Sequence, residues 1–376
     1  MRIGVDARMI AHSGIGTYLQ GLLHALVAAD GGHEYVLFVN PGGEAYVPRT
    51  GRVEVRPVDV PVYGLAERIW FQRRLAAAAC QVVHVPHYNI PWWPPRRTVV
   101  TVHDAIHVRF PEFVPGAGRA QVARLLLSRA VQAGAALLVD SEFTRHDLER
   151  LFPKSAPKIA VAPPGLDPVY RPQPRAAVEA FRARHQLPER YLLFVGLLRP
   201  HKNVERLIEA FATCAPRLGP GTKLVVRGTP DERFPAIVTA LSAAQGRGLV
   251  HWLTAPLDAR DMPLLYAGAH VLVCPSLYEG FGLPVAEAMA CGTPVVAARA
   301  ASLPEVAGDA ALWTDPLDVG ELSAQLERAS TDDALRAALV ARGLVQARRF
   351  DWRETAERTL DVYARVARDG GSKSVA

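Results

Sequence analysis

The chain has 376 residues, of which 49% are hydrophobic and 21% charged, so it can bury a large core and is long enough for about two domains. This composition excludes a largely disordered protein, and we expect disorder only at the ends. The formal net charge is +6, and the excess lies in residues 1–180, which hold 20 basic and 15 acidic side chains against 23 and 22 in residues 181–376. A basic first half favours an anionic acceptor or an anionic membrane surface, and it is equally typical of an arginine-rich surface.

Three other classes of protein are disfavoured. No basic run is interleaved with aromatic residues, so we expect no nucleic-acid binding. The chain opens directly on a strand-like segment without the apolar core of a signal peptide, and it has no stretch of about 18 to 20 apolar residues. The cysteines form no CxxC pair, which indicates reduced thiols rather than disulfides or a zinc site. We therefore expect a cytoplasmic protein, with peripheral contact at the inner membrane surface through the basic first half.

Short apolar segments alternate with longer helix-like segments, the pattern of parallel sheets covered by helices on both faces. The strand candidates are Met1–Val5, Tyr35–Val39, Val53–Val58, Val82–Val85, Val99–Val102, Ala136–Val139, Ile159–Ala162, Tyr191–Val195, Leu224–Val226, Val250–Leu253, Val271–Cys274 and Pro294–Ala297.

A proline-rich segment, Pro163 to Gln186, has a composition typical of a linker. We place the domain boundary there, with a first domain over residues 1–170 and a second over 171–350. Residues 351–376 contain a helix-like tail, Trp352 to Arg368, and end in flexible residues.

Glu279 and Glu287 bracket the most informative segment, Glu279-Gly280-Phe281-Gly282-Leu283-Pro284-Val285-Ala286-Glu287. A strand candidate precedes it and a helix-compatible stretch follows, so glycine-freed amides and a helix start can approach a phosphate. Glu279 would repel a bare phosphate, so we expect it to meet hydroxyls or a positive charge that develops during reaction. Glu287, about two helical turns on, falls near the same face and can accept two hydrogen bonds from a ribose diol. The plain alternative is a pair of solvated helix-cap acids.

A cationic loop, Gly196-Leu197-Leu198-Arg199-Pro200-His201-Lys202-Asn203, follows the strand candidate Tyr191–Val195. The planar guanidinium of Arg199 can bind two phosphate oxygens at once, and the Lys202 ammonium acts as a mobile point charge. Together they can neutralise a leaving diphosphate without a metal. The chain has only five lysines, which argues against Lys202 as casual surface charge, although a solvated loop is the plain alternative. His201 can take the second phosphate contact in place of Arg199.

The first half offers two further candidate sites. Gly14-Ile15-Gly16 precedes a helix-like segment, but it lacks the third glycine of the dinucleotide fingerprint, which disfavours a nicotinamide cofactor. His103 and Asp104 follow a strand candidate, at the strand end where α/β sheets gather ligands. His103 can donate to a sugar hydroxyl or to a leaving phosphate oxygen, whereas Asp104 can equally well cap the turn.

These segments resemble the retaining family-4 glycosyltransferases, which share the GT-B fold. The string PSLYEGFGLPVAEAMACGTPVVA is similar to the donor-site signature of that family, and Val195 through Asn203 with Leu207 to Phe211 is similar to the strand, basic loop and helix that open its second domain. Thr101 to Asp104, Asp140 to Phe143 and Ser302 to Val306 also match, so the resemblance covers nearly the whole chain. Its details are closest to the branch that builds bacterial surface polysaccharides, often with mannosyl donors.

The resemblance implies an α/β protein with two Rossmann-like domains whose parallel sheets face each other across a cleft, and a C-terminal helix that crosses back to the N-terminal domain. It implies a nucleoside diphosphate sugar, GDP- or UDP-linked, as donor, and no other cofactor. No Asp-x-Asp triplet occurs in the chain, so we expect no metal. The donor-binding residues carried over are Gly14, Gly16, Arg199, Lys202, Gly280, Phe281, Gly282, Leu283 and Glu287. Many relatives place the arginine directly after the glycine, where this chain has Leu197, which leaves the choice between Arg199 and His201 open.

The expected reaction transfers a hexosyl unit, with mannose favoured, to a hydroxyl of a glycan, lipid-linked or small-molecule acceptor, with retention as the resemblance implies. Glu279, His103, Lys202 and Arg199 are the expected catalytic residues. The departing phosphate deprotonates the acceptor, and a transient covalent sugar on Glu279 remains an open alternative. Two other classes also remain: a nucleotide-sugar epimerase or phosphorylase on a related scaffold, and a noncatalytic glycan-binding or assembly protein.

Overall fold

The computed structural model describes residues 1–12, 14–29, 31–60, 70–116, 118–255, 257–258 and 260–369. The chain divides into two compact units: unit 1 is Met1–Gly165 with Phe350–Ala376, and unit 2 is Leu166–Arg349. The sequence placed these boundaries at 170/171 and 350/351. None of the described helices combines the length and the apolarity that crossing a bilayer requires.

Unit 1 is built on a parallel sheet of seven strands in the order β3-β2-β1-β4-β5-β6-β7. The strands are β1 (Arg2–Asp6), β2 (Glu34–Val39), β3 (Val53–Pro57), β4 (Val82–Val85), β5 (Thr98–Val102), β6 (Ala136–Val139) and β7 (Ile159–Val161). The helices are α1 (Ile15–Ala28), α2 (Gln72–Ala77), α3 (Ile106–Arg109), α4 (Arg119–Ala133), α5 (Glu142–Leu151) and α14 (Trp352–Asp369).

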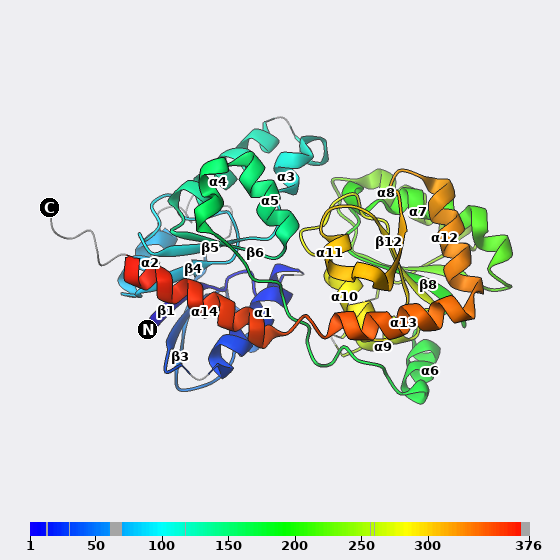
Figure 1. Cartoon of the computed structure of the whole chain (residues 1–376), viewed down its shortest axis with the longest axis horizontal. Helices are drawn as coiled ribbons and strands as arrows, with labels where there is room; N and C mark the ends of the chain where they lie inside the picture. The colour runs from blue at the N-terminus through cyan, green and yellow to red at the C-terminus, as the bar shows by residue number, and fades with distance from the viewer. Residues whose placement is uncertain are drawn as a thin grey trace. The chain divides into compact units, whose positions relative to one another are not determined.

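The two faces of this sheet have separate cores. Helix α1 buries Leu19, Leu22, Leu23 and Leu26, at helical spacing, in one core that also holds Tyr363 of α14. Helices α2, α4 and α5 cover the other face through residues such as Leu75, Leu127 and Leu148. Figure 1 shows α14 (red) beside α1 (blue), so the predicted return of the C-terminal helix to the first domain is confirmed.

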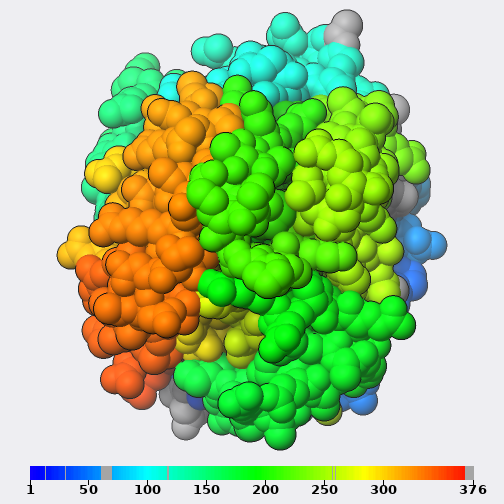
Figure 2. All heavy atoms as spheres, turned by 90° about the vertical axis from the view of Figure 1, so that its right-hand side faces the viewer, coloured from blue at the N-terminus to red at the C-terminus, as the bar shows by residue number. Residues whose placement is uncertain are grey.

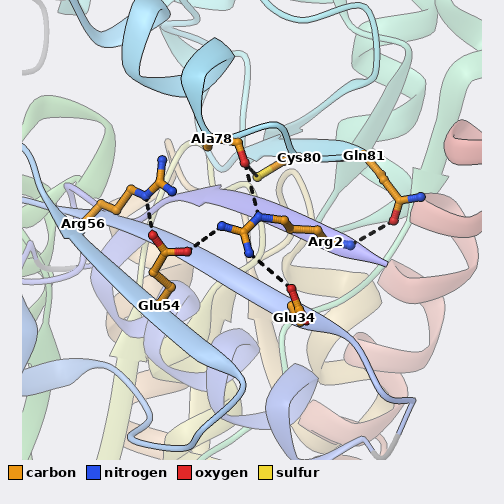
Figure 3. A network of polar contacts seen from close by, with 7 residues as sticks. All are labelled: Arg2, Glu34, Glu54, Arg56, Ala78, Cys80 and Gln81. Atoms are coloured by element: carbon orange, nitrogen blue, oxygen red, sulfur yellow. Dashed lines mark hydrogen bonds and ion pairs between the residues drawn. The ribbon is translucent and has the colours of Figure 1, made fainter.

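An ionic network joins the amino-terminal ends of β1, β2 and β3 (Figure 3). Arg2 donates to Glu34 of β2 (3.2 Å), to Glu54 of β3 and to the Ala78 carbonyl after α2 (3.2 Å). Arg56 shares Glu54. One arginine thus ties the starts of three neighbouring strands together, which supports their register.

Unit 2 holds a parallel sheet of six strands in the order β10-β9-β8-β11-β12-β13. The strands are β8 (Tyr191–Val195), β9 (Lys223–Arg227), β10 (Val250–Trp252), β11 (Val271–Cys274), β12 (Val295–Ala298) and β13 (Ala311–Thr314). The helices are α6 (Arg175–Arg184), α7 (Val204–Cys214), α8 (Pro235–Gly246), α9 (Met262–Ala267), α10 (Leu283–Ala290), α11 (Leu303–Ala307), α12 (Val319–Thr331) and α13 (Asp333–Ala347). Figure 2 looks onto the layer formed by α12 (orange), α7 (green) and α8 (yellow-green).

Each predicted strand is present, and two details differ from the sequence analysis. Strand β13 was missed because it is a four-residue edge strand, Ala311–Thr314, that pairs only with β12. The expected linker up to Gln186 contains helix α6, since its prolines end at Pro174 and residues 175–184 are mostly Ala, Arg and Glu, which favour helix. Val178 and Phe181 of α6 are buried.

Candidate active site in unit 2

The order of the strands places the candidate site. From β8 the chain moves outward to β9 and β10, then crosses to β11 on the other side of β8. In open α/β sheets, ligands bind at the carboxyl ends of strands where the order reverses in this way. The loops after β8 and β11 are the cationic loop and the glutamate segment, so the fold brings the two sequence motifs side by side.

Hydrogen bonds fix these two loops to each other. Asn203, in a left-handed conformation with φ 60°, donates from its side chain to the carbonyls of Pro275 (3.0 Å) and Pro316 (2.7 Å). The Leu277 amide donates to the His201 carbonyl at 2.7 Å. Lys202 is therefore held on a constrained turn, η5 (Pro200–Lys202), beside the end of β11.

Lys202 and Glu279 form a nearly buried ion pair. The Lys202 ammonium lies 2.7 and 2.9 Å from the two carboxylate oxygens, and the side chains are 15% and 11% exposed. The Ser276 hydroxyl donates to Glu279 Oε1 at 2.7 Å. Burial raises the pKa of Glu279, but the charges of Lys202 and His201 and the hydrogen bonds outweigh it, so the pKa lies below its ordinary value. Glu279 is thus held ionised.

The glycine loop that follows Glu279 is tightly shaped. Gly282 has φ 104°, a conformation that favours glycine, and a Cβ there would lie 2.7 Å from Leu303 Cδ2, so the end of the Leu303 side chain would have to shift. The Ser302 hydroxyl lies 3.0 Å from the Glu279 carbonyl and 2.8 Å from the Phe281 carbonyl. This loop leads into α10, which begins at Leu283 with proline in its first turn.

Arg199 lies in the same loop as Lys202 but pairs with a different carboxylate, that of Asp231. Its Nε donates to Asp231 Oδ2 at 3.1 Å, and Asp231 is also paired with Arg233. Hydrogen bonding from Arg233, joined by the nearby charges of Arg233 and Arg199, holds the pKa of Asp231 well below its usual range despite partial burial. The sequence analysis missed Asp231.

Glu287 has surroundings unlike those of Glu279. It is 7% exposed, and the Tyr266 hydroxyl of α9 donates to its Oε2 at 2.6 Å. The Tyr170 hydroxyl also contacts the carboxylate. Burial raises the pKa of Glu287 and the two hydroxyls only partly offset the rise. The alternative of two solvated helix-cap acids is wrong for both glutamates, because both side chains are largely buried.

In unit 1, His103 is held from both sides. Its Nδ1 donates to Asp140 Oδ2 (2.7 Å) and its Nε2 to the Pro86 carbonyl (3.0 Å), and the Tyr18 ring packs edge-on against it at 4.8 Å. Both partners are acceptors, so this geometry favours a ring that carries hydrogen on both nitrogens. Burial opposes this charge, but Asp140 outweighs it and raises the pKa of His103. Asp104 caps the following turn through the Ile106 amide at 3.0 Å, as one of its two interpretations predicted.

The two glycines at the start of α1, Gly14 and Gly16, have different roles. Gly14 takes φ 74° as the N-cap residue of α1. Gly16 donates its amide to the His12 carbonyl at 2.9 Å, and a Cβ there would lie 2.5 Å from the Ile10 carbonyl oxygen. Close backbone packing accounts for this glycine and its amide is engaged within unit 1, while the donor contact expected of Gly16 stays a prediction.

A buried cluster at the end of β1 was not found from the sequence. Arg8 pairs with Asp6 through two hydrogen bonds (2.7 and 2.8 Å), His87 Nε2 lies 3.3 Å from Asp6, and the Arg8 guanidinium stacks 3.6 Å from the Phe71 ring centroid. An Arg two residues after an Asp at a strand end was the available signal. No group of three or more metal-ligating side chains occurs among the described residues.

Two parallel sheets of the GT-B type with an ion-paired glutamate at a strand-order reversal define the fold and a candidate site, and similarity to known proteins shows the family. Residues 12–170 match the family described as Glycosyltransferase Family 4 and residues 178–345 the one described as Glycosyl transferases group 1. The chain belongs to these family-4, group 1 glycosyltransferases, which use nucleotide-sugar donors. The predicted family and fold class are thereby confirmed.

Several relatives and structures are similar over most of their length. O-antigen chain mannosyltransferase B of Escherichia coli is 30% identical over 283 residues, covering 75% of this chain and 74% of that protein. D-inositol 3-phosphate glycosyltransferase of a Nocardioides species is 32% identical over 286 residues, 71% of this chain and 62% of that protein. Sucrose-phosphate synthase from Thermosynechococcus elongatus has a TM-score of 0.79 at 20% identity, covering 98% of this chain and 100% of that one. WaaG, a lipopolysaccharide glycosyltransferase, has a TM-score of 0.76 at 20% identity, covering 96% and 99%.

Proposed function

We propose that this protein is a retaining hexosyltransferase that moves a sugar, with mannose favoured, from a GDP- or UDP-sugar to an acceptor hydroxyl in glycan or glycolipid biosynthesis. The observation that carries the proposal is the Lys202–Glu279 pair at the β8/β11 reversal, a cation and an anion held 2.7 Å apart where a nucleotide sugar would bind. The preference for mannose is supported by the similarity to a mannosyltransferase.

The Lys202–Glu279 pair can stabilise both charges that develop during the reaction. As the bond between sugar and phosphate lengthens, negative charge grows on the diphosphate and positive charge on the sugar ring. Lys202, Arg199 and the amides of residues Gly280 to Leu283 oppose the first, and ionised Glu279 opposes the second. The diphosphate of the donor is an anion that competes with Glu279 for Lys202. Donor binding therefore shifts the pairing of the Lys202 ammonium partly from Glu279 to the phosphate.

The remaining roles are proposed on the resemblance to the family. His103, whose charged form Asp140 favours, is proposed to act on the donor sugar or the leaving phosphate. Gly14 contributes to donor binding through its turn before α1. Glu287 accepts hydrogen bonds from the ribose. The departing phosphate takes the proton of the acceptor hydroxyl, so the acceptor attacks the anomeric carbon on the same face that the phosphate leaves. Recovery of a peptide glycosylated at Glu279 would instead indicate a two-step route through a covalent intermediate.

The proposal includes independence from divalent metal, because Lys202 and Arg199 provide the charge that a metal would otherwise supply. Turnover should be unchanged after chelation with EDTA. Activity that disappears in EDTA and returns with magnesium would contradict this part.

A peripheral contact with anionic membrane in the cytoplasm completes the proposal. Trp93, whose amide donates to Gln72 of α2, is 65% exposed, Trp70 just before α2 is 60% exposed, and Leu125 and Val122 of α4 are 58% and 50% exposed. Residues 70–133 around them contain eight arginines and two acidic residues. Exposed aromatic and aliphatic side chains beside cationic ones suit the interface of an anionic bilayer. Sedimentation with phosphatidylglycerol vesicles, lost in Trp93→Ala/Leu125→Ala, tests this contact.

The deciding experiment has two stages. A thermal-shift screen with GDP, UDP, dTDP and ADP identifies the base, since a ligand that prefers the folded state raises Tm. The matching nucleotide sugars are then assayed with glycan and lipid-linked acceptors, and the anomeric configuration of the product is determined. Conversion of donor without acceptor would indicate an epimerase, dependence on inorganic phosphate a phosphorylase, and no turnover across the panel a binding protein.

A further inference from the structure

A chain of buried side chains crosses unit 1 and connects helix α14 with strands β4 and β5 and with helix α1. The Tyr363 hydroxyl of α14 lies 2.6 Å from His84 Nδ1, and His84 Nε2 lies 2.7 Å from the Thr101 hydroxyl oxygen. The same oxygen lies 3.3 Å from the hydroxyl of Tyr18 on α1. All four residues are at most 2% exposed, so bulk water does not compete for these contacts. We call them the Tyr363–Tyr18 chain.

Tyr18 and Thr101 connect this chain to His103. The Tyr18 ring packs edge-on against the His103 ring with centroids 4.8 Å apart, and edge-on against the Trp352 ring at 5.9 Å. Thr101 precedes His103 by two positions at the end of β5. Helix α14 therefore acts on the surroundings of His103 in two ways, directly on Tyr18 through Trp352 and indirectly through Tyr363.

The uncharged His84 ring makes the partners in the chain depend on one another. Burial lowers the pKa of His84 to about 3, and the electrostatic influence of His103 and His87 adds to this effect. An uncharged imidazole donates with one nitrogen and accepts with the other, so its two partners take opposite roles. If Tyr363 donates to Nδ1, His84 donates to Thr101; if Thr101 donates to Nε2, His84 donates to Tyr363. Loss of either hydroxyl leaves a buried ring nitrogen unpaired, which costs stability unless the remaining partners reorient.

We propose that Tyr363 is a positioning residue for the reaction: through the Tyr363–Tyr18 chain, the C-terminal helix fixes the orientation of the His103 ring. The inference rests on the proposed function, in which His103 acts on the donor sugar or the leaving phosphate. Asp140 and the Pro86 carbonyl hold the two ring nitrogens of His103, and Tyr18 packs against the ring itself. A displacement of about 1 Å at a group that acts on substrate costs up to about 100-fold in rate, so an indirect support is enough to influence turnover.

The first test measures kcat and KM of the full chain with the nucleotide sugar found in the screen. Tyr363→Phe removes one hydroxyl and keeps the ring, and we expect kcat to fall about tenfold while KM for the donor changes less than about twofold. Tyr35→Phe is the matched control, because this tyrosine of the same core is 1% exposed and its hydroxyl donates to the Leu26 carbonyl at 3.0 Å. It should keep the wild-type kcat.

A pair of variants at Thr101 separates positioning from general loss of packing, and decides the question if Tyr363→Phe does not fold. Thr101→Val keeps nearly the same shape but removes the hydroxyl, so we expect the same loss of kcat as in Tyr363→Phe. Thr101→Ser keeps the hydroxyl and should retain most of the wild-type kcat. If packing alone mattered, Thr101→Ser, which lacks the buried methyl group, would lose at least as much as Thr101→Val, and the inference would be overturned.

NMR of the imidazole nitrogens reports the orientation of His103 independently of turnover. The His103 signals, assigned by their absence in His103→Gln, should move in Tyr363→Phe and stay in place in Tyr35→Phe. His103→Gln itself should lose about 100-fold in kcat. If it does, wild-type kcat and unmoved His103 signals in folded Tyr363→Phe and Thr101→Val would overturn the inference and leave the proposed function intact. Wild-type kcat in His103→Gln would overturn the proposed role of His103 and the inference with it, and no turnover of the wild type with any nucleotide sugar would overturn the proposed function itself.

Discussion

Glu279 and Glu287 belong to one short segment of unit 2, yet the fold gives them opposite electrostatics. Glu279 meets Lys202 from the loop after β8, and its pKa falls; Glu287 meets tyrosine hydroxyls from α9 and from the segment before α6, and its pKa rises. Both are buried, so the partner and not the burial decides the sign. Chemically identical residues in one motif thus acquire opposite pKa shifts from the elements that the sheet brings to each.

Removing the charge of Glu279 alone should have the largest effect on turnover. Glu279→Gln keeps the shape of the side chain but gives the developing positive charge on the sugar no anion, so we expect turnover to fall about 1,000-fold. The measurement is the steady-state rate with the nucleotide sugar found in the screen. Glu209→Gln, an exposed change on α7, should leave the rate unchanged. An unaltered rate in Glu279→Gln would remove this residue from the mechanism.

Removing the cation tests the pairing itself. Lys202→Met removes the ammonium that pairs with the largely buried Glu279 carboxylate and leaves it the Ser276 hydroxyl and the nearby His201, so we expect the free energy of unfolding at pH 7 to fall by about 3 kcal/mol. Because the pKa of Glu279 is lowered in the folded wild type, its contribution is present above the ordinary pKa of glutamate and lost as pH falls through the folded value. The difference between wild type and variant should therefore shrink in acid.

A double variant provides the control for that measurement. Lys202→Met/Glu279→Gln removes both charges, so it should be more stable than Lys202→Met alone, and urea unfolding of all four proteins gives the coupling energy. A double variant that loses the sum of the two single losses would mean that the ion pair contributes no coupling.

Glu287→Gln should change stability in the opposite direction. The pKa of Glu287 is raised in the folded state, so the stability of the wild type is fully present below the ordinary glutamate pKa and declines as pH rises through the raised value. The amide avoids that decline and still accepts from Tyr266, so we expect a gain of about 1 kcal/mol at pH 8 that vanishes near pH 4. A loss of stability at pH 8 would show that the carboxylate has a counter-ion.

Ser276→Ala should have the smallest effect. It removes one neutral donor from Glu279 and leaves Lys202 in place, so we expect about 1 kcal/mol lower stability and a turnover reduced only severalfold. Thermal unfolding and the same rate assay measure both. A loss as large as that of Glu279→Gln would give the hydroxyl a direct part in the reaction.

The sequence predicted what depends on local patterns and left open what depends on distant partners. Strand-like runs and the glycines around Phe281 located the sheets and the donor loop, because period and turn chemistry are local properties. The pairing of Lys202 with Glu279, 77 positions apart, and that of Arg199 with Asp231 follow from strand order, which the sequence does not state.

Two features were not foreseen, for specific physical reasons. Gly16 was interpreted as a donor contact because glycine frees an amide, and the sequence could not show that the same small size admits the Ile10 carbonyl or that the amide donates to the His12 carbonyl. The surroundings of Glu287 were missed because Tyr266 and Tyr170 have apolar rings that a sequence pattern assigns to the core, and only the fold shows where their hydroxyls lie.

The close approach of Gly165 to Trp352 has a practical consequence. A Cβ at position 165 would lie 2.1 Å from the Trp352 amide nitrogen, and Thr355 donates to the Pro163 carbonyl at 2.6 Å, so the chain leaves and re-enters unit 1 at one spot. Residues 166–349 are therefore an insert with adjoining ends, which suits transplantation. Unit 2 can be cut out and replaced by that of a related enzyme through two adjoining junctions, one after Gly165 and one before Phe350, as an exchangeable cassette.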